Sequence, residues 1–229
     1  MPKSSKRTKK NRAAARKQGK ILQLKITLRG SKPPIWRRIL ISDQDSFYDL
    51  HRIIQRVFDW DDLHLHEFSY KTEFGREHLQ SLAPDGTPVE DGDFFNDILI
   101  GREDQVRLEE VFARGIFKIN YIYDFGDNWE HIIKLEKVFP YIQGFSEPFC
   151  VYAKGAPPPE DCGGIEEYVY LLEAIEDEDH PEHEEALEWF EDDFDPHDIS
   201  IEIDKMSPKE IEKIYGPSIP LEDYVLDED

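Results

Sequence analysis

Three short segments concentrate the residue types that could do chemistry. They are Tyr123–His131 (YDFGDNWEH), Pro158–Gly164 (PPEDCGG) and Leu63–Phe68 (LHLHEF). Each combines acids with histidines, a cysteine or turn-forming residues, a mixture that packing of a core alone seldom requires. We therefore expect these segments to form one candidate functional surface. Its residues are His64, His66, Tyr123, Asp124, Asp127, Trp129, His131, Glu160, Asp161 and Cys162.

The histidines and carboxylates of these segments are chemically sufficient to bind a divalent metal ion. His64 and His66 are two positions apart, so on a strand both would point to the same side, as adjacent ligands require. With His131 and Asp127 they form the candidate ligand set. The spacing matches no recognised metal motif, so the alternative is that these histidines are hydrogen-bonded core residues. No other cofactor is expected.

The carboxylates could instead supply an acid/base pair. Two carboxylates in a partly dry cleft would have separated pKa values, which hydrolytic chemistry uses. The favoured interpretation is simpler: Asp124 and Asp127 accept backbone N–H bonds in a turn, and Glu160 and Asp161 precede a helix whose N-terminus favours negative charge. No nucleophile elbow, phosphate loop or dinucleotide fingerprint is present, which favours a function other than catalysis. Cys150 and Cys162 lack redox or zinc spacing and are expected to be buried thiols.

Charge is strongly polarised along the chain. Residues 1–20 contain nine of the 28 Lys and Arg residues and no acid, whereas the rest of the chain carries the 50 acidic residues. The basic segment cannot bury apolar area and is expected to be a disordered arm. The arm would bind nucleic acid phosphates nonspecifically, or else serve as a solubilising extension. Seven of its nine cationic residues are the candidate phosphate contacts: Lys6, Arg7, Lys9, Lys10, Arg12, Arg16 and Lys17.

Composition indicates a cytoplasmic protein with one core. The chain has 229 residues, of which 39% are hydrophobic, enough to bury one substantial core. No apolar run approaches the roughly 20 residues that cross a bilayer, and no apolar segment follows the basic N-terminus as in a secretory signal. Two cysteines fit a reducing compartment and give no disulfide framework. We expect no membrane association.

Hydrophobic periodicity predicts the elements that must position the candidate residues. Ile21–Arg29 alternates as a half-buried strand, and Ile35–Ser42 is expected to be its antiparallel partner. Leu63–Lys71 is a further strand, whereas residues 72–104 are interpreted as rich in loops. Ser46 should cap a helix with Asp49 in its first turn. The buried stripe of that helix should comprise Phe47, Leu50, Ile53, Ile54, Val57 and Phe58.

The strongest single prediction is a hairpin over residues 116–137. Tyr121 and Trp129 lie on the apolar faces of its two strands and should be buried. The connecting turn begins at Asp124 and has Gly126 at its third position, which is typical of a type II turn with φ > 0 at the glycine. A short helix is expected within Gln105–Phe112.

The last third of the chain should be helical and acidic. Ile165–Ile175 is amphipathic, and Pro181–Phe190 is expected to be helical with Leu187, Trp189 and Phe190 packed in the core. Exposed aromatic residues there would instead favour a protein partner. A final helix should begin at Ser207, which is followed by proline and completes a capping box with Glu210.

Four motifs in a fixed order resemble the plasmid pRiA4b ORF-3-like domain family. They are Ile35-Trp36-Arg37-Arg38, His64-Leu65-His66-Glu67-Phe68, Tyr123–His131, and Cys150 followed by the Pro158–Gly164 loop. The resemblance spans about residues 20–205, and the ordered set is more specific than any one motif. It implies a prokaryotic protein associated in part with mobile elements, and it implies no catalytic residues.

The sequence thus predicts an α+β fold: a single compact domain in which a mainly antiparallel sheet packs with several helices. We divide the chain into a basic tail (1–20), the domain (21–205) and a C-terminal helix with an acidic tail (206–229). The predicted function is that of a binding or accessory module for a protein or a nucleic-acid-associated partner. The alternative is a metal-dependent hydrolase that uses the histidine and carboxylate cluster.

Overall fold

The computed structural model describes residues 19–89, 97–190, 195, 203 and 205–225. Most of the predicted basic tail, including all seven arm residues, lies outside the described residues. Lys20, which was assigned to that tail, is instead the first residue of β1. No described helix is both long and apolar enough to cross a membrane.

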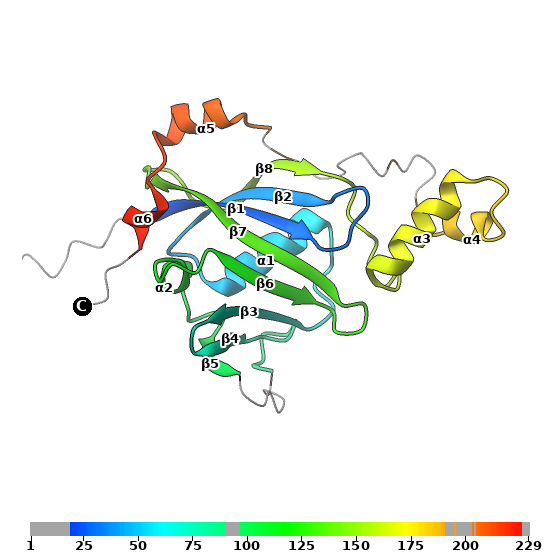
Figure 1. The fold of residues 1–229 in the computed structure, drawn as a ribbon, viewed down its shortest axis with the longest axis horizontal. Coiled ribbons are helices and arrows are strands. Elements are labelled where there is room, and N and C mark those ends of the chain that lie inside the picture. Colours follow the sequence, from blue (N-terminus) through cyan, green and yellow to red (C-terminus); the bar gives the residue numbers. More distant parts are fainter. Residues whose placement is uncertain (1–18, 90–96, 191–194, 196–202, 204, 226–229) are drawn as a thin grey trace, which may run out of the picture.

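The described residues form eight strands in one sheet (Figure 1). The order across the sheet is β5-β4-β3-β6-β7-β1-β2-β8, and every neighbouring pair is antiparallel except β4 and β5. The sheet is therefore mixed but mostly antiparallel, which is compatible with the predicted α+β class. The strands are β1 (Lys20–Leu28), β2 (Trp36–Ser42), β3 (His66–Thr72), β4 (Gly75–Gln80), β5 (Ile98–Arg102), β6 (Lys118–Tyr123), β7 (Trp129–Pro140) and β8 (Phe149–Lys154).

Helices cover the two faces of the sheet unequally. Figure 1 shows α1 lying across one face, and this face carries the larger core, to which Leu22 of β1 contributes. The neighbouring Ile21 points to the opposite face, where a smaller cluster packs under Ile211 and Tyr215 of α5. The described helices are α1 (Phe47–Phe58), α2 (Leu108–Phe112), α3 (Gly164–Glu176), α4 (His183–Leu187), α5 (Pro208–Tyr215) and α6 (Leu221–Tyr224).

The predicted start of α1 is confirmed. The Asp49 backbone N–H donates to Ser46 Oγ at 3.1 Å, and the Ser46 backbone N–H donates to Asp49 Oδ2 at 2.9 Å. These two bonds are the reciprocal capping box that satisfies helix N–H groups without helical partners. All six residues of the predicted apolar stripe are buried. A capping box likewise begins α5 at Ser207, as expected.

The predicted hairpin forms between β6 and β7, with Tyr121 opposite His131. Tyr121 and Trp129 are buried as expected. The predicted turn type is wrong, because φ is positive at Asp124 (54°) and Asn128 (56°) and not at Gly126. Asp124 Oδ1 accepts the Gly126 N–H at 2.8 Å, so the aspartate stabilises the bend with its own side chain. Aspartate and asparagine tolerate the left-handed region better than other residues with a Cβ.

Three regions differ from the sequence-based interpretation. The segment interpreted as loop-rich contains β4 and β5, and β8 was not expected. Each has only five or six residues, and β4 buries Glu77 and His78, which hides its apolar pattern. In α4 and its continuation, Leu187 and Trp189 are exposed, so the prediction that both pack in the core is wrong. Phe190 is half-buried against Tyr168, with ring centroids 6.3 Å apart.

Candidate functional site

The two main sequence motifs meet at one end of the β6–β7 hairpin, as predicted. The Gly163 backbone N–H donates to Asp127 Oδ2 at 3.0 Å. The Tyr123 hydroxyl donates to the Glu160 carboxylate through a short hydrogen bond. The hairpin turn and the loop before α3 therefore form one structural unit although they are distant in sequence.

Two glycines allow this close approach. Gly163 and Gly164 have φ of 92° and 83°, in the left-handed region that favours glycine. A Cβ on Gly164 would lie 2.4 Å from the carbonyl oxygen of Asp127, closer than van der Waals contact permits. Backbone packing against the hairpin turn thus requires Gly164, whereas Gly163 is favoured by its positive φ.

Tyr123 and Glu160 fix the segment that carries His64. Besides its bond to Glu160, the Tyr123 hydroxyl accepts the Leu63 N–H at 3.0 Å. Glu160 also accepts the Asp61 N–H at 2.7 Å. Burial, with the adjacent Glu160 carboxylate as a second cause, raises the pKa of Tyr123 well above its usual range. Tyr123 is therefore a neutral donor at physiological pH, and its role is to hold the loop.

The held loop brings His64 against carboxylates from both motifs. His64 Nε2 lies 2.9 Å from Asp161 Oδ1, and His64 Nδ1 lies 3.8 Å from Asp124 Oδ2. One ligand atom from each of these three residues lies within 4.8 Å of the other two. Among the described residues this is the one group of three or more histidine, cysteine or acidic side chains with such spacing.

The other predicted metal ligands lie elsewhere. His66 is buried, stacks on His51 with ring centroids 3.6 Å apart, and contacts Glu103 at 2.8 Å. His131 is fully buried and its Nδ1 bonds the Trp129 carbonyl oxygen at 2.9 Å. Burial lowers the pKa of His131 to about 3. Both histidines occupy the core, which is the alternative left open by the sequence.

The predicted ligand set of His64, His66, His131 and Asp127 therefore does not converge. The strand begins at His66, so His64 lies in the preceding loop and the argument from strand alternation does not apply to the pair. The carboxylates that lie near His64 are those of Asp124 and Asp161. The Asp127 carboxylate instead accepts the backbone N–H of Gly163. The geometry on which the hydrolase alternative depended is not met.

The two remaining candidate residues are buried. Trp129 packs beside Trp60, with ring centroids 5.8 Å apart. Cys162 is a free thiol, and burial, followed by the nearby Asp127, raises its pKa to about 12. Cys150 is also free and buried. The expectation of buried thiols is confirmed, and neither cysteine is a reactive thiolate at neutral pH.

Sequence reasoning missed two exposed apolar residues at this site. Leu63, beside His64, is 64% exposed, and Phe125, beside Asp124, is 52% exposed. The signal for Phe125 was an apolar residue inside a predicted turn, where no core needs it, whereas Leu63 had been assigned to the predicted strand Leu63–Lys71. With His64, Asp124 and Asp161 they form what we call the motif surface.

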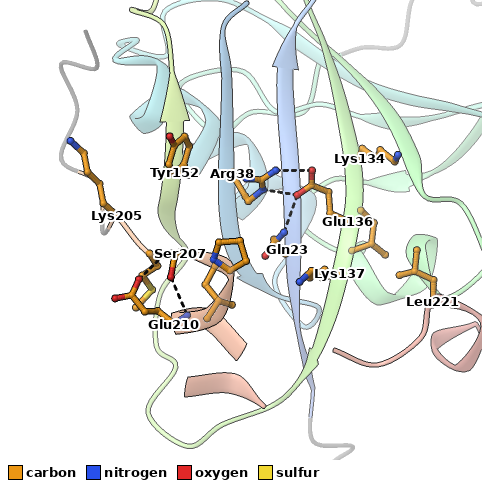
Figure 2. Close-up of a pocket in the computed structure, with 14 residues that line it drawn as sticks. Gln23, Arg38, Lys134, Glu136, Lys137, Tyr152, Lys205, Ser207, Glu210 and Leu221 are labelled. Atoms are coloured by element: carbon orange, nitrogen blue, oxygen red, sulfur yellow. Dashed lines mark hydrogen bonds and ion pairs between the residues drawn. The ribbon is translucent and has the colours of Figure 1, made fainter. Parts of the chain in front are cut away.

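A groove of about 700 Å³ lies between the sheet and the segment leading into α5 (Figure 2). On its floor the Arg38 guanidinium forms a bidentate pair with Glu136 at 2.6 and 3.0 Å. Gln23 donates to the same carboxylate at 2.9 Å. These three polar groups satisfy one another, and Lys134, Tyr152 and Lys205 also line the groove. The sequence had not indicated it.

Comparisons with known proteins place this chain among relatives of one protein family. The family model described as plasmid pRiA4b ORF-3-like protein matches residues 20–203. The uncharacterized protein y4hQ of Sinorhizobium fredii is 34% identical over 169 residues, which cover 74% of this chain and 80% of that protein. A crystal structure of a protein of unknown function, MM3350 from Methanosarcina mazei Go1, is 35% identical, with a TM-score of 0.65. The match covers 83% of this chain and 97% of that one.

Proposed function

The chain belongs to the plasmid pRiA4b ORF-3-like protein family, and from this premise we propose that it is a binding module whose partner contacts the motif surface. The observation that carries the proposal is the pair of exposed apolar side chains, Leu63 and Phe125, beside a histidine and two carboxylates. Exposed apolar groups rimmed by polar residues are typical of protein interaction sites.

The chemistry of the surface favours a basic protein as the partner. Asp161 presents negative charge near the apolar pair, Asp124 is largely buried close to it, and the whole chain has a formal net charge of −22. The negative net charge would attract a partner's lysine and arginine side chains at long range, and the carboxylates would form ion pairs with them on contact. Proteins that associate with nucleic acids are commonly basic, so we infer a nucleic-acid-associated protein in a prokaryotic cytoplasm.

The basic arm extends this proposal to nucleic acid itself. Lys6, Arg7, Lys9, Lys10, Arg12, Arg16 and Lys17 would contact phosphates while the motif surface holds the protein partner. Replacing all seven by glutamine in the full chain should abolish nonspecific binding of duplex DNA. Binding by the unaltered chain should weaken steeply as salt rises. Equal DNA binding by both chains would contradict a role for the arm.

The motif surface is tested by crosslinking and affinity capture from the native host. We expect the double variant Leu63→Ser, Phe125→Ser to lose the captured protein. Phe74→Ser is the matched control, because Phe74 is 77% exposed but lies in the turn between β3 and β4. Crosslinks should map to the motif surface, and high salt should release the partner. Retention of the partner by the double variant, or crosslinks to another face, would contradict the proposal.

A further inference from the structure

We propose that His64, Asp124 and Asp161 form a binding site for a first-row divalent transition metal ion of the Zn²⁺ or Mn²⁺ class. The inference uses three residues of the motif surface, but it is tested by metal binding alone, so its failure and the failure of the proposed partner are distinguishable. It uses a different ligand set from the one that the sequence indicates. Its elements are a histidine on a held loop, a carboxylate with one oxygen already hydrogen-bonded, and an exposed carboxylate.

The contact between His64 and Asp161 is the first argument. Their atoms Nε2 and Oδ1 lie 2.9 Å apart, yet Nε2 is inaccessible to solvent and makes no hydrogen bond of acceptable geometry. Two atoms with lone pairs repel at this distance unless a proton or a cation lies between them. Because the N–H direction does not meet the oxygen, a cation that both atoms face satisfies them better than a shared proton.

Charge is the second argument. Among the ion pairs of the described residues, Asp124 and Asp161 are paired with His64 and with no lysine or arginine. Two carboxylates beside one imidazole leave a local excess of negative charge that a divalent cation would neutralise. The imidazole nitrogen selects transition metals, since Ca²⁺ and Mg²⁺ prefer all-oxygen sites.

The anchoring of each side chain fits such a site. The Tyr123 and Glu160 bonds fix the loop that carries His64. Asp124 commits Oδ1 to the Gly126 N–H and leaves Oδ2 3.8 Å from His64 Nδ1, the ring nitrogen that Asp161 does not approach. These hydrogen bonds around the ligands are the kind that orient metal-binding side chains.

Only a small rearrangement is needed to close the site. Bonds of about 2.1 Å in a tetrahedral arrangement separate ligand atoms by about 3.4 Å. The three ligand atoms already lie within 4.8 Å of one another. Asp161 approaches His64 Nε2 and Asp124 approaches Nδ1, so an ion bound to one ring nitrogen requires one carboxylate to move toward it. Asp161, whose side chain is 63% exposed, is the freer of the two to do so. Three protein ligands would leave a coordination position for water or for a partner's side chain.

Metal titration of the untagged full chain tests the inference. After treatment with a chelator, calorimetric titration with ZnCl₂ and MnCl₂ should show one site per chain, and MgCl₂ should bind more weakly. Substitution with Co²⁺ should give the visible absorption of a site with a nitrogen ligand. His64→Gln and Asp161→Asn should each weaken Zn²⁺ binding by about tenfold or more. Zn²⁺ should also raise the melting temperature of the unaltered chain and not that of the variants.

Two control variants separate a site from general attraction by an acidic surface. His180→Gln removes a histidine from another acidic region, and Asp127→Asn removes a carboxylate next to the site but outside the ligand set. Both should bind Zn²⁺ as the unaltered chain does. Asp161 is exposed, so Asp161→Asn should fold normally even if His64→Gln does not. Absence of Zn²⁺ and Mn²⁺ binding, or equal weakening in control and ligand variants, would overturn the proposal.

Discussion

Asp127 accepts the backbone N–H of Gly163 at 3.0 Å and so ties the turn of the β6–β7 hairpin to the loop before α3. The adjacent Gly164 lies against the Asp127 carbonyl oxygen. Through this junction two motifs that are separate in sequence act as one structural unit. The unit also carries Asp124 and Asp161 toward His64.

The junction predicts that Gly164→Ala is strongly destabilising. A Cβ there would be strained by the positive φ of 83° and would also clash with the Asp127 backbone. Gly86→Ala is the matched control, since Gly86 has φ of 81° and nothing within 4 Å of its Cβ position. Strain alone costs about 1–2 kcal/mol, and the clash should add about 1–3 kcal/mol to Gly164→Ala only. Urea denaturation measures both, and equal losses would contradict close packing at the junction.

The hairpin predicts a contrast between Trp129 and Asp127. Trp129→Ala should lower the free energy of unfolding by about 3–5 kcal/mol, because the ring is buried beside Trp60. Asp127→Asn keeps an oxygen that can accept the Gly163 N–H and should leave the fold nearly intact. The melting temperatures of the two variants measure this contrast. If Asp127→Asn melts as low as Trp129→Ala, the charge of Asp127 is itself a structural requirement.

Arg37 is predicted to be a structural arginine that lysine cannot replace. It is fully buried and donates to the carbonyl oxygens of Val57, Trp36, Lys154 and Gly155. Burial lowers its pKa to about 10, which still leaves it charged at pH 7. Lysine lacks the planar fork that reaches these acceptors.

Arg37→Lys should therefore cost about 3 kcal/mol or more. Arg38→Lys is the control, because Arg38 lies on the opposite, more open face and pairs with Glu136. It should cost about 1 kcal/mol or less. Chemical denaturation of both variants gives the comparison, and similar losses would show that the buried carbonyl contacts are not what requires arginine.

His131 predicts a loss of stability in acid. Its pKa is about 3 in the folded protein, against an ordinary value of 6.5, because burial disfavours the imidazolium. Between pH 3 and pH 6.5 the unfolded chain binds more protons than the folded one. The contribution of His131 to stability is therefore complete above pH 6.5 and is lost as the pH falls toward 3. At pH 5 the loss should be about 2 kcal/mol.

The measurement is urea unfolding at pH 7.5 and pH 5 for the unaltered chain and His131→Gln. The fall in stability between the two pH values should be smaller in the variant by about 2 kcal/mol. Asp45, whose burial raises its pKa to about 6, has the opposite pH dependence. It is present in both proteins and so cancels in the comparison. Identical pH profiles would show that His131 is not held neutral by burial.

The sequence alone determined the features that depend on residues close together in the chain. The cap at Ser46 with Asp49 in the first turn, the apolar stripe of α1 and the burial of Tyr121 and Trp129 were all predicted correctly. A cap involves residues three positions apart, and alternation repeats every second residue, so a short window contains the whole signal. The meeting of the two motifs was also predicted, from their shared composition.

Only the tertiary structure decided which side chains face one another. Edge strands such as β5 are defined by pairing with a neighbour rather than by their own pattern. His64 and His66 are almost adjacent in sequence, yet one meets Asp161 in the loop before α3 and the other stacks on His51 of α1. The separation arises because β3 begins between them, where its pairing with β6 starts at His66 and Tyr123. Such pairing depends on contacts between distant segments, and no local spacing of residues encodes it.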